Sequence, residues 1–183
     1  MSRTFALRHA ISASLVVIAL VAAPLAAQQP PAANSPQAAL VADAANLSSK
    51  FTGLARVMAG KYDWKPGTGV RSVSEVFNLI VTENNMLAGL LSGAAAGRGG
   101  GMAAGPAITD PMAMQNALRD SYASVSKALS SLSVSDLNAP VTLFGQNTTK
   151  QGAVLMLLMD QHEHLGQSIA YARSNAVVPP WSK

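Results

Sequence analysis

The sequence predicts an all-α protein, a four-helix bundle preceded by a signal peptide. Of the 183 residues, 49% are apolar but only 5% are aromatic, a balance more typical of helices than of strands. Apolar residues recur at spacings of three, four and seven in four separate segments, as one buried face of a helix requires. Segments rich in Gly, Pro and Ser divide the four helical segments, and we find no alternating pattern typical of a strand.

The N-terminus has the pattern of a secretory leader. In residues 1–27, Arg3 and Arg8 start the chain, an apolar run follows, and small residues end at Ala27. The apolar run is shorter than the roughly 20 residues that a membrane span needs, so we expect cleavage after Ala27 rather than an anchor. The chain should then be periplasmic or secreted, without stable membrane insertion, and residues 28–36 should form a flexible linker.

The helical domain is expected to occupy residues 37–183. Its first helix should span residues 37–59 and end at Gly60, and the second should begin at Ser72, with Glu75 completing a capping box. We expect the second helix to end near Gly93. The apolar stripes of these two helices are Leu40, Leu47, Phe51, Leu54 and Met58, then Val73, Val76, Phe77, Ile80, Leu87, Leu90 and Leu91.

The second half of the domain should contain the third and fourth helices. Residues 93–107, mostly Gly and Ala, are interpreted as a flexible crossover loop, since they lack the Lys and spacing of a phosphate-binding loop. Thr109 or Asp110 should cap the third helix, and Thr148 or Thr149 the fourth, with an irregular connection over residues 132–146 between them. The two apolar stripes are Met114, Leu118, Tyr122, Val125 and Leu129, then Val154, Leu157, Leu158, Leu165, Ile169 and Ala172.

The charge distribution argues against nucleic-acid binding. The formal net charge is +4, but two of the 13 basic residues lie in the leader, and the remainder do not cluster. A surface that tracks phosphates needs several cations on one face. The absence of cysteine excludes a disulfide framework, a thiolate metal site and a cysteine nucleophile.

Three polar residues on two of the predicted helices form a candidate metal site. Asp160 and His164 are four residues apart and share one face of the fourth helix, whereas His162 points away from His164. Glu83 lies among apolar residues of the second helix, and a buried carboxylate needs a partner. These residues could together supply three oxygen and nitrogen ligands. The alternative is that Asp160 and His164 form only a solvent-exposed ion pair along the helix.

Four segments of the chain resemble the DinB-like superfamily. They are residues 62–66 (YDWKP), 70–77 (VRSVSEVF), 164–173 (HLGQSIAYAR) and 177–181 (VVPPW). The first two are similar to that family's first loop and second helix, and the last two to its fourth helix and C-terminus. The similarity covers roughly residues 40–183, with the motifs in the family's order.

The resemblance implies a four-helix bundle, a homodimer and a divalent-metal site for a small-molecule substrate. Family members typically use three histidines, which correspond here to Leu79, Asp160 and His164. Only His164 keeps the family's residue, and Leu79 cannot bind a metal, so Glu83 would have to replace it. The family's characterised branches include thiol-dependent S-transferases and isomerases. The first hypothesis for this chain is an exported metal-dependent hydrolase or thiol transferase, with zinc, nickel, manganese or iron as the metal. The alternative function is a non-catalytic helical binding or scaffold protein that has lost the metal site.

Overall fold

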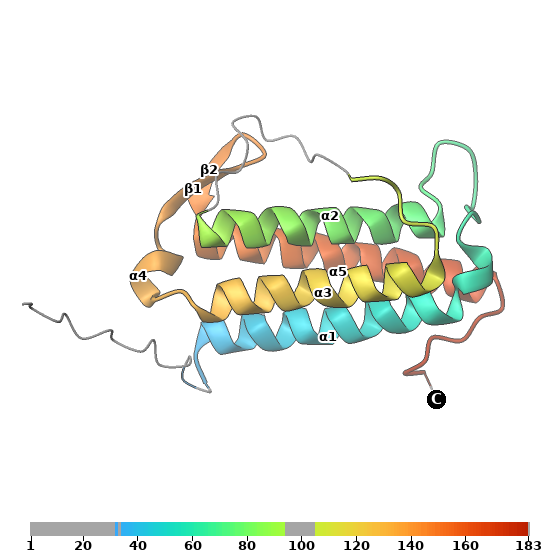
Figure 1. Ribbon diagram of the computed structural model, residues 1–183, viewed down its shortest axis with the longest axis horizontal. Helices are drawn as coiled ribbons and strands as arrows, with labels where there is room; N and C mark the ends of the chain where they lie inside the picture. Colours follow the sequence, from blue (N-terminus) through green and yellow to red (C-terminus); the bar gives the residue numbers. More distant parts are fainter. Residues whose placement is uncertain (1–31, 33, 94–104, 183) are drawn as a thin grey trace, which may run out of the picture.

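Four long helices pack side by side around a common core in the computed structural model, which describes residues 32, 34–93 and 105–182 (Figure 1). The long helices are α1 (Pro36–Val57), α2 (Val73–Ser92), α3 (Pro111–Ser130) and α5 (Lys150–Ser174). Helix α1 contacts α3 and α5, and α2 contacts the same two helices. Helices α2 and α5 run in opposite directions in Figure 1. The predicted signal peptide, most of the predicted linker and most of the predicted crossover loop lie outside the described residues.

The helices begin at side chains that can accept a hydrogen bond from the first turn. The predicted capping box of α2 is confirmed: the Ser72 N–H donates to Glu75 Oε2 at 2.6 Å, and the Glu75 N–H donates to Ser72 Oγ at 3.3 Å. The bond from the Ser72 N–H to the carboxylate, with a smaller contribution from the Ser72 side chain, lowers the pKa of Glu75. Asp110 caps α3 and Thr149 caps α5, which decides between the alternatives that the sequence left open.

The first helix differs slightly from its predicted bounds. It starts at Pro36, with Ser35 as its N-cap, and it ends at Val57, before the predicted Gly60. A short 3-10 helix, η1 (Ala59–Lys61), continues the chain. The apolar pattern persists through Met58, which is buried, so periodicity alone could not locate the change from one helix type to the other.

The connection between α3 and α5 is ordered, and its prediction as irregular was wrong. It contains α4 (Val134–Leu137) and two antiparallel strands, β1 (Pro140–Leu143) and β2 (Gln146–Thr149). Phe144 and Gly145 form the turn, both with positive φ, at 50° and 76°. The chain is therefore mostly helical rather than purely α. A hairpin of four-residue strands turning on Phe-Gly lacks the usual Asn-Gly or Asp-Gly signal.

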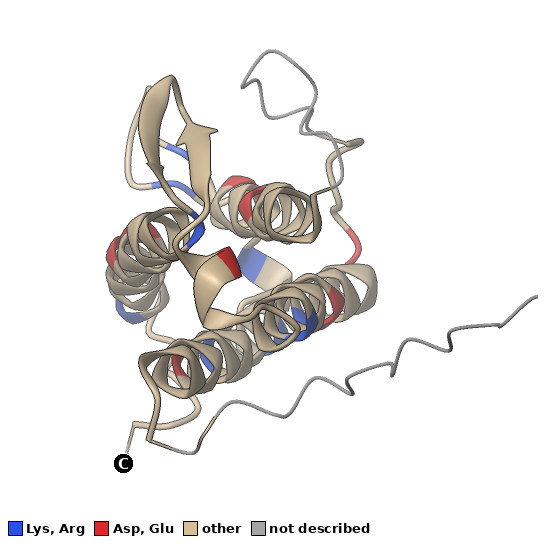
Figure 2. Ribbon diagram, turned by 90° about the vertical axis from the view of Figure 1, so that its left-hand side faces the viewer, with Lys and Arg blue, Asp and Glu red and all other residues tan. Residues whose placement is uncertain are grey.

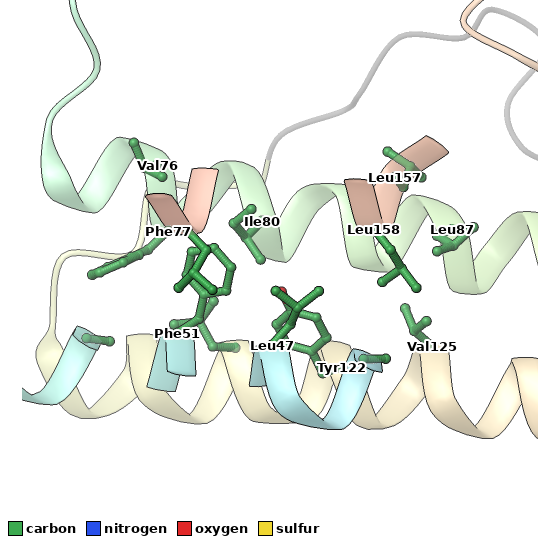
Figure 3. Packing of buried hydrophobic residues seen from close by; sticks show 14 of the residues in the cluster. Leu47, Phe51, Val76, Phe77, Ile80, Leu87, Tyr122, Val125, Leu157 and Leu158 are labelled. Carbon is green, nitrogen blue, oxygen red and sulfur yellow. The ribbon is translucent and has the colours of Figure 1, made fainter. Parts of the chain in front are cut away.

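An aromatic cluster lies within the buried core (Figure 3). The Phe51 ring meets Phe77 edge-on and stacks against Tyr122, each with ring centroids 6.3 Å apart. These side chains come from α1, α2 and α3, so one cluster joins three helices. Most of the predicted stripe positions are buried, which confirms the assignment of the buried faces, although Leu40 and Ile169 are only partly buried.

Charged residues are interspersed along the helices rather than gathered by sign (Figure 2). This arrangement agrees with the scattered charges of the sequence. Among the residues that the structure describes, no helix combines the length and apolar character needed to cross a membrane.

Candidate metal centre

Glu83 is a buried carboxylic acid in the middle of α2. It follows Ile80 by one turn and precedes Leu87 by another, both fully buried, and only 4% of Glu83 is exposed. Its Oε2 atom is buried and has no hydrogen-bond partner among the described residues. A buried charged oxygen without a partner is strongly unfavourable, so this site requires either a proton or a bound cation.

Asp160 and His164 on α5 lie beside Glu83. His164 Nε2 is 3.5 Å from Asp160 Oδ2, one helical turn away. One potential ligand atom from each of Glu83, Asp160 and His164 lies within 4.8 Å of the others. The structure therefore brings together all three residues of the predicted group, and Glu83 does not face bulk water.

The three residues form a site that is closed at its base and open at its edge. Glu83 is buried, the His164 side chain is 16% exposed and the Asp160 side chain is 44% exposed. Solvent can therefore reach the group from the Asp160 side. The arrangement differs from the alternative of a simple surface pair, because the third member lies in the core.

The electrostatics of the group favour a bound positive charge. Burial, together with the negative charge of Asp160, raises the pKa of Glu83 to about 8, while Gln161 and Arg71 act in the opposite direction. Glu83 thus retains a proton at neutral pH when no cation is present. A divalent cation could replace that proton and balance both carboxylates.

The donor set fits a divalent metal ion, and so does the separation of two of its three members. Two carboxylate oxygens and one imidazole nitrogen are common ligands of zinc, manganese and iron. Two ligands about 2.1 Å from one tetrahedral ion are separated by about 3.4 Å. The Asp160–His164 distance of 3.5 Å agrees with that spacing. Leu79 is half-buried one turn before Glu83 and offers no ligand atom.

A buried polar network fixes the relative position of α2 and α5 beside this group. Gln161 Nε2 donates to Asn84 Oδ1 at 3.0 Å, and Tyr122 OH donates to Gln161 Oε1 at 2.9 Å. Asn84 also donates through Nδ2 to Ser121 Oγ at 3.1 Å. All four residues are buried, so the network links three helices within the core.

Sequence reasoning missed this network, although its signal was present. Asn84 lies four residues after Ile80, and Gln161 lies four residues after Leu157, so both occupy positions of the apolar stripes. Polar residues at such positions must be hydrogen-bonded. The sequence does not show which polar residues would pair, because the partners belong to different helices.

A second chain of contacts lies on the outer side of His164. Its Nδ1 is 2.9 Å from Gln167 Oε1, Gln167 Nε2 donates to Tyr171 OH at 2.7 Å, and Tyr171 OH donates to the Arg71 carbonyl at 3.1 Å. The Tyr171 ring also packs edge-on against Trp64, with centroids 5.2 Å apart. The N-terminal and C-terminal motifs identified in the sequence therefore meet beside the candidate site.

His162 lies elsewhere, as the helical spacing predicted. Its Nε2 is 2.9 Å from Asp43 Oδ2 on α1, in an exposed pair. A shallow depression of about 400 Å³ between α1 and α3, lined in part by Thr52 and Arg119, also lies away from the three-residue group. The candidate metal site is therefore not enclosed in that depression.

Two solved structures share this fold. A DinB-like protein from Bacillus cereus matches with a TM-score of 0.65 and 16% identity, covering 79% of this chain and 95% of its own. A DinB-like protein from Bacillus subtilis matches with a TM-score of 0.59 and 16% identity, covering 75% and 92%. No protein-family model and no curated protein matches the sequence. The chain has the DinB-like fold, which confirms the resemblance at the level of fold.

Proposed function

We propose that this chain is an exported DinB-like four-helix bundle that binds a divalent metal ion through Glu83, Asp160 and His164. The observation that carries the proposal is the buried Glu83 Oε2, which has no partner among the described residues and lies beside two further ligand side chains. A structural acid would be expected to pair with a basic or donor group. Glu83 instead lies beside a second carboxylate, that of Asp160, and a bound cation would stabilise two adjacent carboxylates.

The proposed activity is that of a metal-dependent hydrolase or thiol transferase acting on a small molecule. A divalent ion, when bound, supplies Lewis acidity that lowers the pKa of water or thiols and polarises a carbonyl or phosphoryl oxygen. Glu83 would hold the ion from α2, on the core side, and His164 would hold it from α5. Asp160, the most exposed of the three, would be the residue nearest an approaching substrate and able to exchange protons with solvent.

Metal content is the experiment that tests this proposal. Protein purified without chelators is expected to contain about one zinc, nickel, manganese or iron ion per chain, measured by plasma mass spectrometry. His164→Asn should lose the ion, and His162→Asn, which changes only the exposed pair with Asp43, should retain it. Equal metal content in the two variants, or none in the unmodified protein, would contradict the proposal.

A non-catalytic binding or scaffold role is the second candidate, and Leu79 favours it. This position offers no ligand atom where the family resemblance implies one, so Glu83 would have to supply the third ligand of the group. In a scaffold, Asp160→Ala and His164→Ala would leave partner binding unchanged. Each would cost on the order of 1 kcal/mol, as the loss of a partly exposed ion pair does.

Export is a separate part of the proposal and rests on the leader pattern of residues 1–27. Expression in a bacterial host, followed by intact-mass analysis of the periplasmic fraction, should give a chain beginning at Gln28. A chain that retains Met1 and sediments with membranes would show an uncleaved anchor instead.

A further inference from the structure

We propose that Gln167 and Tyr171 are positioning residues that keep the neutral imidazole of His164 protonated on Nδ1, with the lone pair of Nε2 directed at Asp160 and Glu83. That this tautomer serves to orient His164 as a metal ligand rests on the proposed metal-binding function. The tautomer itself follows from hydrogen bonds and can be measured without a metal.

The direction of each hydrogen bond follows from the Arg71 end. The Arg71 carbonyl can only accept, so the Tyr171 hydroxyl, 3.1 Å away, donates to it. With its hydrogen used, the Tyr171 oxygen accepts from Gln167 Nε2 at 2.7 Å. The Gln167 amide is thereby oriented, and its Oε1 faces His164 Nδ1 at 2.9 Å. Because Oε1 can only accept, Nδ1 carries the hydrogen.

The other ring nitrogen then has a lone pair that faces oxygen. His164 Nε2 lies 3.5 Å from Asp160 Oδ2, and a lone pair directed at a carboxylate is unfavourable unless a cation lies between them. The hydrogen-bond chain therefore holds the imidazole in the tautomer that an isolated His–Asp pair would avoid. This tautomer leaves Nε2 free to bind a metal without first losing a hydrogen.

The surrounding structure holds the hydrogen-bonded residues Gln167 and Tyr171 in place. Tyr171 is only 6% exposed, and its ring packs edge-on against Trp64. Arg71 directly precedes Ser72, the N-cap of α2. The series of hydrogen bonds therefore ends at the start of the helix that carries Glu83. Hydrogen-bonded partners of this kind orient metal-binding histidines, and their loss typically weakens metal affinity by about 10–100-fold.

The test measures the His164 tautomer and zinc affinity in matched variants. The shifts of the two ring nitrogens in ¹⁵N NMR spectra show which one carries the hydrogen, and His164→Asn assigns the signals. Spectra of the metal-free protein would be recorded at about pH 9, where imidazoles are neutral. The variants are Gln167→Leu and Tyr171→Phe, with Gln167→Glu as the conservative replacement that can still accept from Nδ1.

Tyr62→Phe is the control variant for Tyr171→Phe, because it removes the same kind of hydrogen bond. Tyr62 OH donates to the Ala55 carbonyl at 3.0 Å, so Tyr62→Phe also removes one hydrogen bond from a phenol to a backbone carbonyl. That bond connects the segment after α1 to α1 itself and does not involve His164.

We expect the Nδ1–H tautomer in the unmodified protein, in Gln167→Glu and in Tyr62→Phe. Gln167→Leu and Tyr171→Phe should shift to the Nε2–H tautomer and bind zinc about 10–100-fold more weakly in calorimetric titrations. An Nε2–H tautomer in the unmodified protein, or unchanged tautomer and affinity in both variants, would overturn the inference. If the unmodified protein binds none of zinc, nickel, manganese and iron, the proposed function fails, and the tautomer measurement still decides the inference.

Discussion

Gln161 Nε2 donates to Asn84 Oδ1 at 3.0 Å, so the residues that directly follow Asp160 and Glu83 are bonded to each other across the core. A shift of α5 along α2 by one turn, about 5.4 Å, would break this bond and separate the two carboxylates. This bond therefore helps to hold the register of the two helices, on which the candidate metal site depends.

Replacing Gln161 by Leu should reduce both stability and metal affinity. The change leaves Asn84 Oδ1 without its donor and Tyr122 OH without its acceptor, at a cost of about 1–3 kcal/mol for each buried group. Urea denaturation would measure the free energy of unfolding. As a control, Gln115→Leu removes only a local bond to Pro111 within α3, and it should cost about 1 kcal/mol and leave zinc affinity unchanged.

Metal-free protein should lose stability as the pH rises from about 4.5 to about 8. Burial raises the pKa of Glu83 to about 8, so over this range the folded state binds a proton that the unfolded state has released. The free energy of unfolding should fall by up to about 1.4 kcal/mol per pH unit. Denaturation curves at several pH values with a chelator would measure the slope.

Glu83→Gln provides the control for that pH dependence, because it cannot ionise. Its stability should vary much less between pH values of about 5 and 8, and added zinc should not stabilise it. An unchanged slope in this variant would show that another group causes the pH dependence.

Leu79→His should strengthen metal binding. The new imidazole would lie one turn before Glu83 on the same face of α2, within reach of the three-residue group. A fourth protein ligand should raise zinc affinity by at least about tenfold. Calorimetric titration of the variant and of Leu79→Asn, whose side chain is shorter and lacks the imidazole, would separate ligation from a general gain in polarity.

Phe144→Asn should stabilise the β1–β2 hairpin. Phe144 adopts a φ of 50°, which Asn tolerates better than Phe, and the residue is 47% exposed, so little burial is lost. We expect a gain of about 0.5–1 kcal/mol in the free energy of unfolding. Gly145→Ala, at a φ of 76°, should have the opposite sign.

The helices could be predicted from sequence because their signals are local. The Ser72–Glu75 capping box and the Asp110-Pro111 start both lie within a few residues of the helix ends that they mark. The hairpin could not be predicted, because its strands are short and Leu143 is its only residue buried in the core.

The candidate site could be predicted only in part. The Asp160–His164 pair follows from helical spacing, and Glu83 was identified because it interrupts an apolar face. Gln161 bonds to Asn84, which is 77 positions away in the sequence, and Tyr171 bonds to Arg71, which is 100 positions away. No local sequence pattern encodes such contacts.

The central claim is that Glu83, Asp160 and His164 bind one metal ion. The most direct test is a crystal of the protein grown with zinc, with anomalous diffraction recorded at the zinc absorption edge. We predict a single strong peak about 2.0–2.2 Å from an oxygen of Glu83, an oxygen of Asp160 and Nε2 of His164. A peak at His162 and Asp43 instead, with none beside Glu83, would contradict the account.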